Sequence, residues 1–271
     1  MKYWAERLQK TQDVLAEKSV KDIEKQLKEY YEKTMNHAIA SFEATHDKLL
    51  AEAEEGIPPT PADLYNLDKY WNLQAQLRRE VEKLGDRSIA LLSRRFELYF
   101  FNAYYSLNLE GVTQTFNSLD TQVAQQMINQ IWCADGKSWS QRVWDNMSLL
   151  QQTLNEGLIE VVAAGKSSND LKNILQGRFG VSFTQADTLV RTEVSHIQTQ
   201  AAKKRYQDYG LERYEILGNE DDSCTPKGVK KRGVDCHEMH GKIFYYNEMV
   251  TGKNAPPFHP RCRCCIIPVI E

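Results

Sequence analysis

The hydrophobic and polar positions at the start of the chain follow a helical period. From residue 3 to about residue 55 there is no proline or glycine, and Glu, Lys, Ala, Leu and Gln dominate. Apolar side chains recur at near-helical spacing; they are Leu8, Leu15, Val20, Ile23, Leu27, Tyr31, Ile39, Phe42 and Leu49. The pattern predicts one long helix or two in series. Its narrow stripe fits packing on a partner element or another subunit, or a solvated arm along its own body.

Three prolines at positions 58, 59 and 61 end this first helical region, because proline removes a backbone donor and biases the preceding residue away from helical dihedrals. Helical patterns resume over residues 64–84 and again over residues 87–109. The second run carries an aromatic stripe, which at helical spacing is typical of a core or a subunit interface. Its members are Phe96, Tyr99, Phe100, Phe101, Tyr104 and Tyr105.

Further helices are expected through the middle of the chain, over residues 120–132, 139–161, 171–175 and 186–209. Ser138 follows a tight turn and is a suitable N-cap for the second of them, and Gly165 would end it. Ser167 or Ser168 would cap the third. Gly177 and Gly180 are expected to separate the last two, and Thr184 would cap the last.

After Gly210 the pattern changes to short strand-like runs over residues 212–217, 242–246 and 265–270. The predicted fold class is therefore mainly α, with long N-terminal helices and a helical body, followed by a small C-terminal α+β module with short strands. Three domains are expected. They are residues 1–118, a long-helix region; 119–210, the helical body; and 211–271, a β-rich zinc-binding module.

Charge and hydropathy narrow the classes of partner. The formal net charge is −3 and the pI is near 6.1, so the chain as a whole exerts no electrostatic attraction on DNA or an anionic membrane. No apolar run approaches the roughly 18 to 20 residues of a membrane span, and the first residues lack the apolar block of a signal peptide. We expect a protein made and kept in the cytosol, without a membrane partner.

The cysteines are the main chemical signal. Five of the six lie between residues 224 and 265, and Cys133 stands alone. In a reducing cytosol such a cluster favours a metal site, and a disulfide framework is the alternative. The C-terminal module is too small to rely on its own apolar core, so a structural metal would supply stability. Thiolates and imidazoles are the ligands that Zn²⁺ takes up in closed tetrahedral sites.

Spacing narrows the choice of zinc ligands. Cys262 and Cys264 are two positions apart at the entrance to a strand and can face one way, whereas Cys265 must face the other. His259 lies just before them in a proline-rich loop, and Cys224 and Cys236 flank a loop containing the basic run 227–232. The predicted ligands are Cys224, Cys236, His259 and one of Cys262 or Cys264, or both of these if His259 does not bind.

Catalytic patterns are missing from the sequence. There is no phosphate-binding glycine loop, no G-x-S-x-G elbow and no H-E-x-x-H helix. An open catalytic zinc site keeps three protein ligands and a nearby general base, and nothing orders Asp235 or Glu238 for that role. We therefore expect a structural zinc, no small-molecule substrate and no enzyme activity.

Other polar residues have simpler expected roles. His240 is expected to be a loop residue or one that hydrogen-bonds to a ligand without binding the metal, and Arg191-Thr192-Glu193 a charge cluster that stabilises its helix. The remaining expectations are packing or solvent-facing roles for His37, His46 and His196, and a buried apolar role for Cys133.

Several segments of the second half of the chain form a recognisable set: they are Arg191 to Val194, Gln198 to Ala202, Tyr206, Gly210, Asp221 to Cys224, Cys236, His240 to Phe244 and Pro256 to Cys264. Together they resemble the Mu gpF-like phage head morphogenesis family of minor capsid proteins. The resemblance is specific for roughly residues 130–271. That family usually has two residues between its paired cysteines, whereas Thr225 to Asp235 separate Cys224 from Cys236 here.

The resemblance implies a virion protein of a tailed phage or prophage, present in the host cytoplasm during assembly. It implies association with the portal or the inner capsid, help in head assembly and in DNA packaging or ejection, and packaged DNA nearby. Portal, major capsid and scaffold proteins are the implied partners of the N-terminal helices and the aromatic stripe. Two alternatives from other classes are a zinc-dependent nuclease or hydrolase using the Cys/His cluster, and a DNA-binding packaging factor using residues 227–232.

Overall fold

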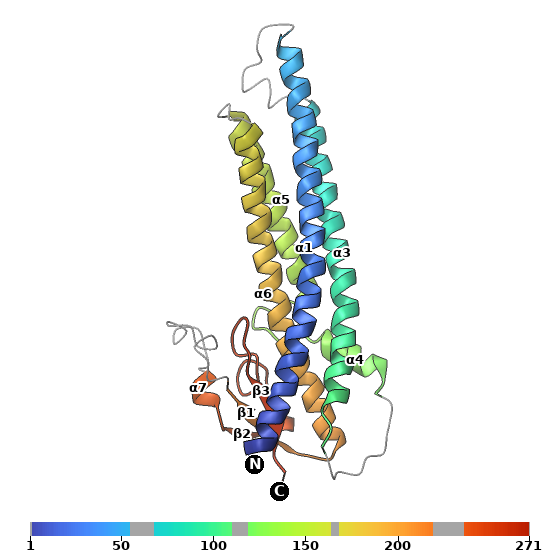
Figure 1. The fold of residues 1–271 in the computed structure, drawn as a ribbon, viewed down its shortest axis with the longest axis vertical. Helices are drawn as coiled ribbons and strands as arrows, with labels where there is room; N and C mark the ends of the chain where they lie inside the picture. Colours follow the sequence, from blue (N-terminus) through green and yellow to red (C-terminus); the bar gives the residue numbers. More distant parts are fainter. Residues whose placement is uncertain (1, 55–67, 110–118, 164–167, 219–235, 271) are drawn as a thin grey trace. The chain divides into compact units, whose positions relative to one another are not determined.

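The computed structural model describes residues 2–54, 68–109, 119–163, 168–218 and 236–270. Helices account for most of them, and a small sheet lies near the C-terminus (Figure 1), so the predicted mainly α class with a small C-terminal sheet is confirmed. The elements are α1 (Lys2–Glu54), α3 (Asp68–Ser106), α4 (Thr121–Ile128), α5 (Trp139–Ala163), α6 (Ser168–Asp208), β1 (Arg213–Leu217), α7 (Cys236–Met239), β2 (Ile243–Tyr245), η2 (Tyr246–Glu248) and β3 (Cys265–Pro268).

The N-terminal segment forms one continuous helix, α1, rather than two in series. Its stripe is buried at Val20, Ile23, Leu27 and Tyr31, and the side chains between them are exposed or half-buried. The prolines that were predicted to end this helix lie outside the described residues, as do Gly165 and Ser167.

Helix α3 corrects the expectation of two runs, because it continues through Gly85 without a break. The reason is packing. A Cβ atom at Gly85 would lie 2.6 Å from the Trp144 ring and 3.1 Å from Met147, so the glycine allows α5 to approach closely. The aromatic stripe on this helix is confirmed as core at Phe96, Tyr99 and their neighbours Phe100 and Tyr104; Tyr105 is exposed.

Helix α6 is a second correction, since it runs unbroken through Gly177 and Gly180. Thr184 does not cap a new helix: its hydroxyl donates to the Gly180 carbonyl four residues earlier, at 2.9 Å, as happens inside a helix. Both glycines are exposed, while Leu175 and Phe179 between and beside them are buried. Burial of this apolar face outweighs the low helix propensity of glycine.

Alanine at the two exposed α6 glycines should stabilise the protein. Apart from the adjacent backbone of the helix itself, no atom of the described residues lies within 4 Å of a Cβ built at Gly177 or Gly180. Gly177→Ala and Gly180→Ala should therefore each raise the free energy of unfolding by about 1 kcal/mol, the helix propensity difference. The measurement is urea unfolding. Gly157→Ala is the matched control: its Cβ would lie 2.7 Å from Ile174, and this clash should offset the gain. Destabilisation by Gly177→Ala would indicate an interrupted helix.

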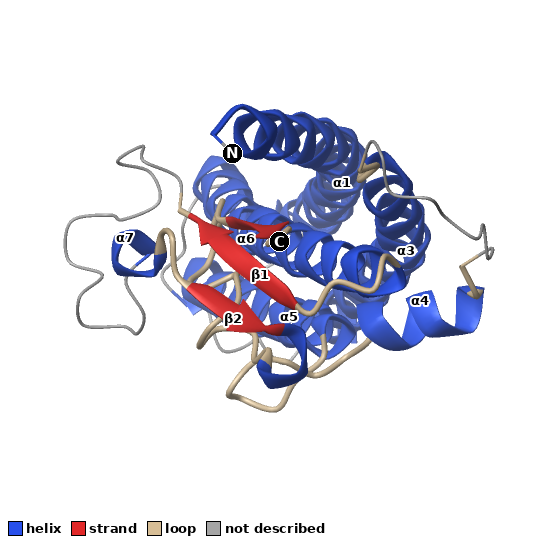
Figure 2. Cartoon of the chain, turned by 90° about the horizontal axis from the view of Figure 1, so that it is seen from below, coloured by secondary structure: helices blue, strands red, loops and turns tan. Residues whose placement is uncertain are grey.

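The three predicted strands are confirmed and form an antiparallel sheet in the order β2-β1-β3. Figure 2 shows β1 in the middle. Tyr214 is opposite Phe244 on one side and Pro268 on the other, and Leu217 is opposite Cys265. This register fixes the start of β3, and with it the loop that bears His259 and Cys262. Helix α4 ends at Ile128, four residues earlier than predicted, at an Asn129 C-cap.

The chain contacts group into two compact units, each assembled from separate segments. The first comprises Met1–Glu24, Leu91–Gln141 and Asp187–Glu271; the second comprises Lys25–Ala90 and Arg142–Ala186. The second unit has an apolar core that includes Leu77, Leu84, Leu150 and Leu158. The predicted domain boundaries after residues 118 and 210 remain predictions.

A line of buried side-chain hydrogen bonds crosses the first unit. The Tyr99 hydroxyl donates to Gln198 Oε1 at 2.7 Å, Gln198 Nε2 donates to Gln12 Oε1 at 2.8 Å, and Gln12 Nε2 donates to the Ile266 carbonyl at 3.4 Å. All three polar side chains are nearly inaccessible to solvent, so each amide needs such partners. The line ties α3, α6 and α1 to β3. It therefore holds the strand that follows the cysteine-rich loop.

Candidate metal centre

Cys236 is the first residue of α7 and is fully buried in the core of the first unit. That core also holds Tyr206 from α6, Tyr214 from β1, and Cys262. Such an apolar environment keeps a thiol rigid and excludes water from any ion bound to it.

The loop before β3 supplies the other two side chains. Cys262 is buried and its backbone N–H donates to the His259 carbonyl at 3.2 Å. His259 is half-buried, and its Nδ1 lies 2.8 Å from the Pro260 carbonyl, which can only accept. Nδ1 therefore carries the hydrogen and Nε2 offers its lone pair. Fixing the tautomer through a backbone carbonyl is typical of histidines that bind metals.

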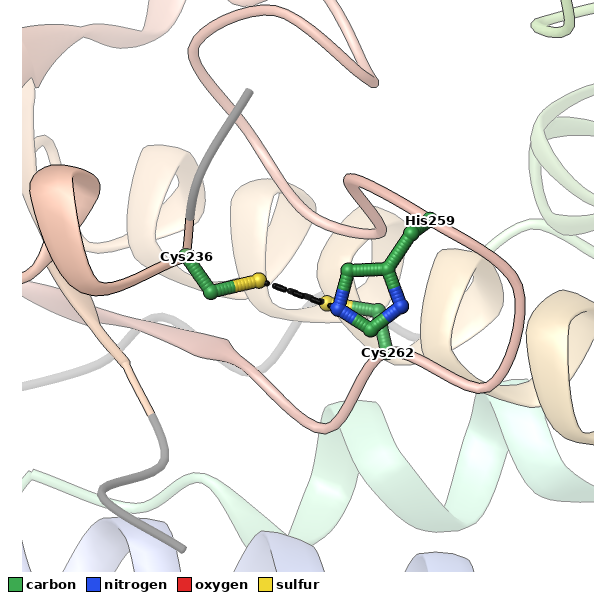
Figure 3. A group of neighbouring side chains, drawn as sticks. All are labelled: Cys236, His259 and Cys262. Carbon is green, nitrogen blue, oxygen red and sulfur yellow. Dashed lines mark hydrogen bonds between the residues drawn. The ribbon is translucent and has the colours of Figure 1, made fainter. Parts of the chain in front are cut away.

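The three ligand atoms converge on one point (Figure 3). His259 Nε2 is 3.1 Å from Cys236 Sγ, and the sulfurs of Cys236 and Cys262 are 3.8 Å apart. All three atoms lie within 4.8 Å of one another. Zn–S bonds of about 2.3 Å in a tetrahedron place two sulfurs about 3.8 Å apart, so the pair already has the spacing of a zinc site. Cys236, His259 and Cys262 could hold a metal ion.

The other cysteines occupy different places. Cys264 is buried in the same core, but among the described residues its sulfur is not part of the three-residue group. Cys265 packs on the other side with Leu217 and Ile267, as the strand period predicts, and burial raises the pKa of its thiol far above the ordinary range. Cys224 lies outside the described residues, so its role as a ligand remains a prediction. Cys133 is half-buried.

His240 lies in the turn that follows α7. Its Nδ1 accepts a hydrogen bond from the Gly218 backbone N–H at 3.1 Å, and its side chain is exposed. A Cβ atom at Gly218 would come within 3.0 Å of the Cys236 carbonyl and 3.2 Å of His240. The absence of a side chain at Gly218 therefore lets the end of β1 pack against α7, which begins at Cys236, and the turn that follows it.

The Arg191-Thr192-Glu193 segment does more than stabilise its own helix. Arg191 pairs with Asp187 four residues earlier at 2.9 Å, as expected, but also with Glu24 on α1 at 2.9 Å. Thr192 binds the metal-site loop through Arg261. Glu193 is buried and accepts from Trp132 Nε1 at 3.2 Å. These contacts join positions far apart in sequence, and the spacing within the segment gives no sign of them.

His196 is completely buried on α6, and its ring stacks on Trp132 with centroids 4.7 Å apart. Within the described parts of the chain, neither ring nitrogen has a hydrogen-bond partner. Burial lowers the pKa of this imidazole to about 3. Of the two roles expected for it, packing is the one observed.

Residues 152–267 match the model of the family described as Phage Mu protein F like protein. The matched segment includes all of α6 and the candidate metal centre. The resemblance to the Mu gpF-like family, a family of phage head morphogenesis proteins, is thus confirmed over these residues. No curated protein and no solved structure matches the chain. Among the described residues, no helix is both long and apolar enough to span a membrane.

Proposed function

We propose that this chain is a minor capsid protein of a tailed phage or prophage, associated with the portal or the inner capsid, and that it acts by assembly rather than by catalysis. The family match over residues 152–267 carries the proposal. On this view the protein resides in the virion, contacts portal, scaffold or major capsid proteins, and assists head assembly and the packaging or ejection of DNA.

We further propose that the metal is zinc and that its role is structural. Two buried sulfurs at 3.8 Å and an oriented imidazole nitrogen form a donor set that suits zinc better than hard, oxygen-preferring cations. Cys224 is the proposed fourth ligand, which would close the tetrahedron and leave no open position for a substrate. A closed site of this kind stabilises a fold and does not activate water.

Head assembly with the portal, scaffold and major capsid proteins of the same phage tests the proposed role. Mass spectrometry of purified heads should detect the chain in a few copies per particle, and heads assembled without it should be defective. Normal, infectious heads that lack the chain would contradict the proposal.

Incubating the zinc-loaded protein with DNA tests the nuclease alternative. DNA cleavage that a chelator stops while the protein stays folded would show that the zinc is catalytic and not structural.

Cysteine variants separate the predicted fourth ligand from its neighbours. Loss of a residue that only hydrogen-bonds to a metal ligand typically weakens metal binding by roughly 10- to 100-fold. Cys224→Ser removes a proposed ligand itself, so it should weaken zinc binding by more than this. Cys264→Ala should leave one zinc per chain, because its sulfur is outside the ligand group, and Cys133→Ser is the matched control distant in sequence. Zinc content and competition with a chromophoric chelator are the measurements. Retention of full affinity by Cys224→Ser would remove Cys224 from the ligand set.

A further inference from the structure

Arg261 stands between His259 and Cys262 and is bound to α6 through three separate contacts. Its backbone N–H donates to Thr192 Oγ1 at 3.0 Å. Its Nε donates to Thr188 Oγ1 at 3.1 Å, and its Nη2 pairs with Asp187 Oδ2 at 2.7 Å. We call these contacts the Arg261 clasp. They join the metal-site loop to a helix about seventy positions earlier in the chain.

The acceptor groups on α6 are oriented by contacts within the helix itself. The Thr192 hydroxyl donates its hydrogen to the Thr188 carbonyl at 2.7 Å, which leaves its lone pairs to accept from Arg261. The Asp187 side chain is only 10% exposed and is also bound by Arg191, so its carboxylate is held in place before the loop docks. A carboxylate this sheltered forms a stronger ion pair than an exposed one.

The backbone conformation of Arg261 is unusual for a residue other than glycine. Its φ is 60°, in the left-handed region that favours glycine, whereas glycine is absent from the loop between Asn254 and Cys265. This conformation turns the chain so that His259 and Cys262 face Cys236 together. The side chain and the backbone N–H of Arg261 both bind α6, and such contacts can hold a residue in a sparsely populated conformation.

We infer that Arg261 is a positioning residue for the metal centre: the clasp holds the loop in its ligand-presenting conformation before the ion arrives and so sets the affinity for metal. The inference rests on the proposed zinc site. It also assigns a role to the pairing of Thr192, in the helix, with Arg261, in the loop. Because coupling is reciprocal, a bound metal would in turn strengthen the docking of the loop on α6.

Zinc affinity of the full chain tests this inference. Arg261→Ala and Thr192→Val should each raise the zinc dissociation constant by about 10- to 100-fold, the usual effect of removing a partner that orients a ligand. Lys204→Gln is the matched control, since it removes a cation of the same helix that pairs with Asp208 and not with the clasp, and its dissociation constant should match that of the wild type. An unchanged dissociation constant for Arg261→Ala would overturn the inference.

Amide hydrogen exchange of the zinc-free chain distinguishes this inference from the proposed site on which it rests. Residues 258–264 should exchange faster in Arg261→Ala than in the wild type, while the β1 amides exchange at the same rate. If the wild type bound no zinc, the proposed metal site would fail, and exchange would still decide whether the clasp orders the loop. Equal exchange in the two proteins would overturn the clasp itself.

Discussion

Removing the metal should lower the unfolding temperature of the protein by roughly 8 to 16 °C. An ion present at about 1,000 times its dissociation constant stabilises the folded state by about 4 kcal/mol, and each kcal/mol shifts the melting temperature of a chain of this size by roughly 2 to 4 °C. The effect is expected because Cys236 and Cys262 belong to the apolar core that also contains Tyr206, Tyr214 and Tyr246. Differential scanning calorimetry before and after chelation measures the shift.

The matched control for chelation is the double variant Cys236→Ser with Cys262→Ser. It should bind no zinc, and its melting temperature should not respond to the chelator. A wild-type protein that carries zinc and melts at the same temperature without it would show that the ion does not stabilise the fold. Metal-free protein with Cys236 joined to another cysteine, detected by mass spectrometry, would instead favour the disulfide alternative.

Local patterns in the sequence suffice for much of this fold and for most of the candidate site. The apolar period predicts α1 and the core role of Phe96 and Tyr99 on α3, and strand-like runs predict the sheet. Three of the predicted ligands, Cys236, His259 and Cys262, meet as a group. The predictions of the helix, the core residues and the sheet succeed because residue period acts over short distances along the chain, whereas the binding of metal by the three grouped side chains stays a prediction.

The errors arise where tertiary contacts override local preference. Glycine costs a helix about 1 kcal/mol, which a sequence pattern treats as a break, but the apolar faces beside Gly85 and Gly177 gain more by continuing the helix. The Arg261 clasp is another case. Thr192 and Arg261 are 69 positions apart, and only the packing of the loop on α6 brings them together.

His196 should make the stability of the protein depend on pH in a specific direction. Burial lowers the pKa of its imidazole to about 3 in the folded chain, whereas an unfolded chain has a value near 6.5. Between these two values the unfolded state binds more protons, so stability falls as the pH falls from about 6.5 towards 3. From pH 7 to pH 5 the loss attributable to this one side chain is about 2 kcal/mol.

Other groups also titrate in this range, so the prediction concerns a difference between proteins. His196→Leu replaces the ring by an apolar side chain of similar size, and urea unfolding at pH 7 and pH 5 should show that this variant loses about 2 kcal/mol less than the wild type. Ile197→Val is the control for packing: the neighbouring side chain is equally buried but does not titrate, so it should cost about 1 kcal/mol at both pH values.

The structural reason for so large an effect is burial: within the described residues, neither ring nitrogen of His196 has a hydrogen-bond partner. Its ring stacks on Trp132, and the nearby Glu193 carboxylate accepts from Trp132 Nε1. The cost of desolvating a charged imidazole is therefore not offset by an ion pair, and His196 is protonated only when this part of α6 opens to water. Equal losses of stability by His196→Leu and the wild type between pH 7 and pH 5 would contradict the prediction. They would mean that, in the folded protein in solution, the imidazole contacts water or a carboxylate of the chain and is not buried against Trp132.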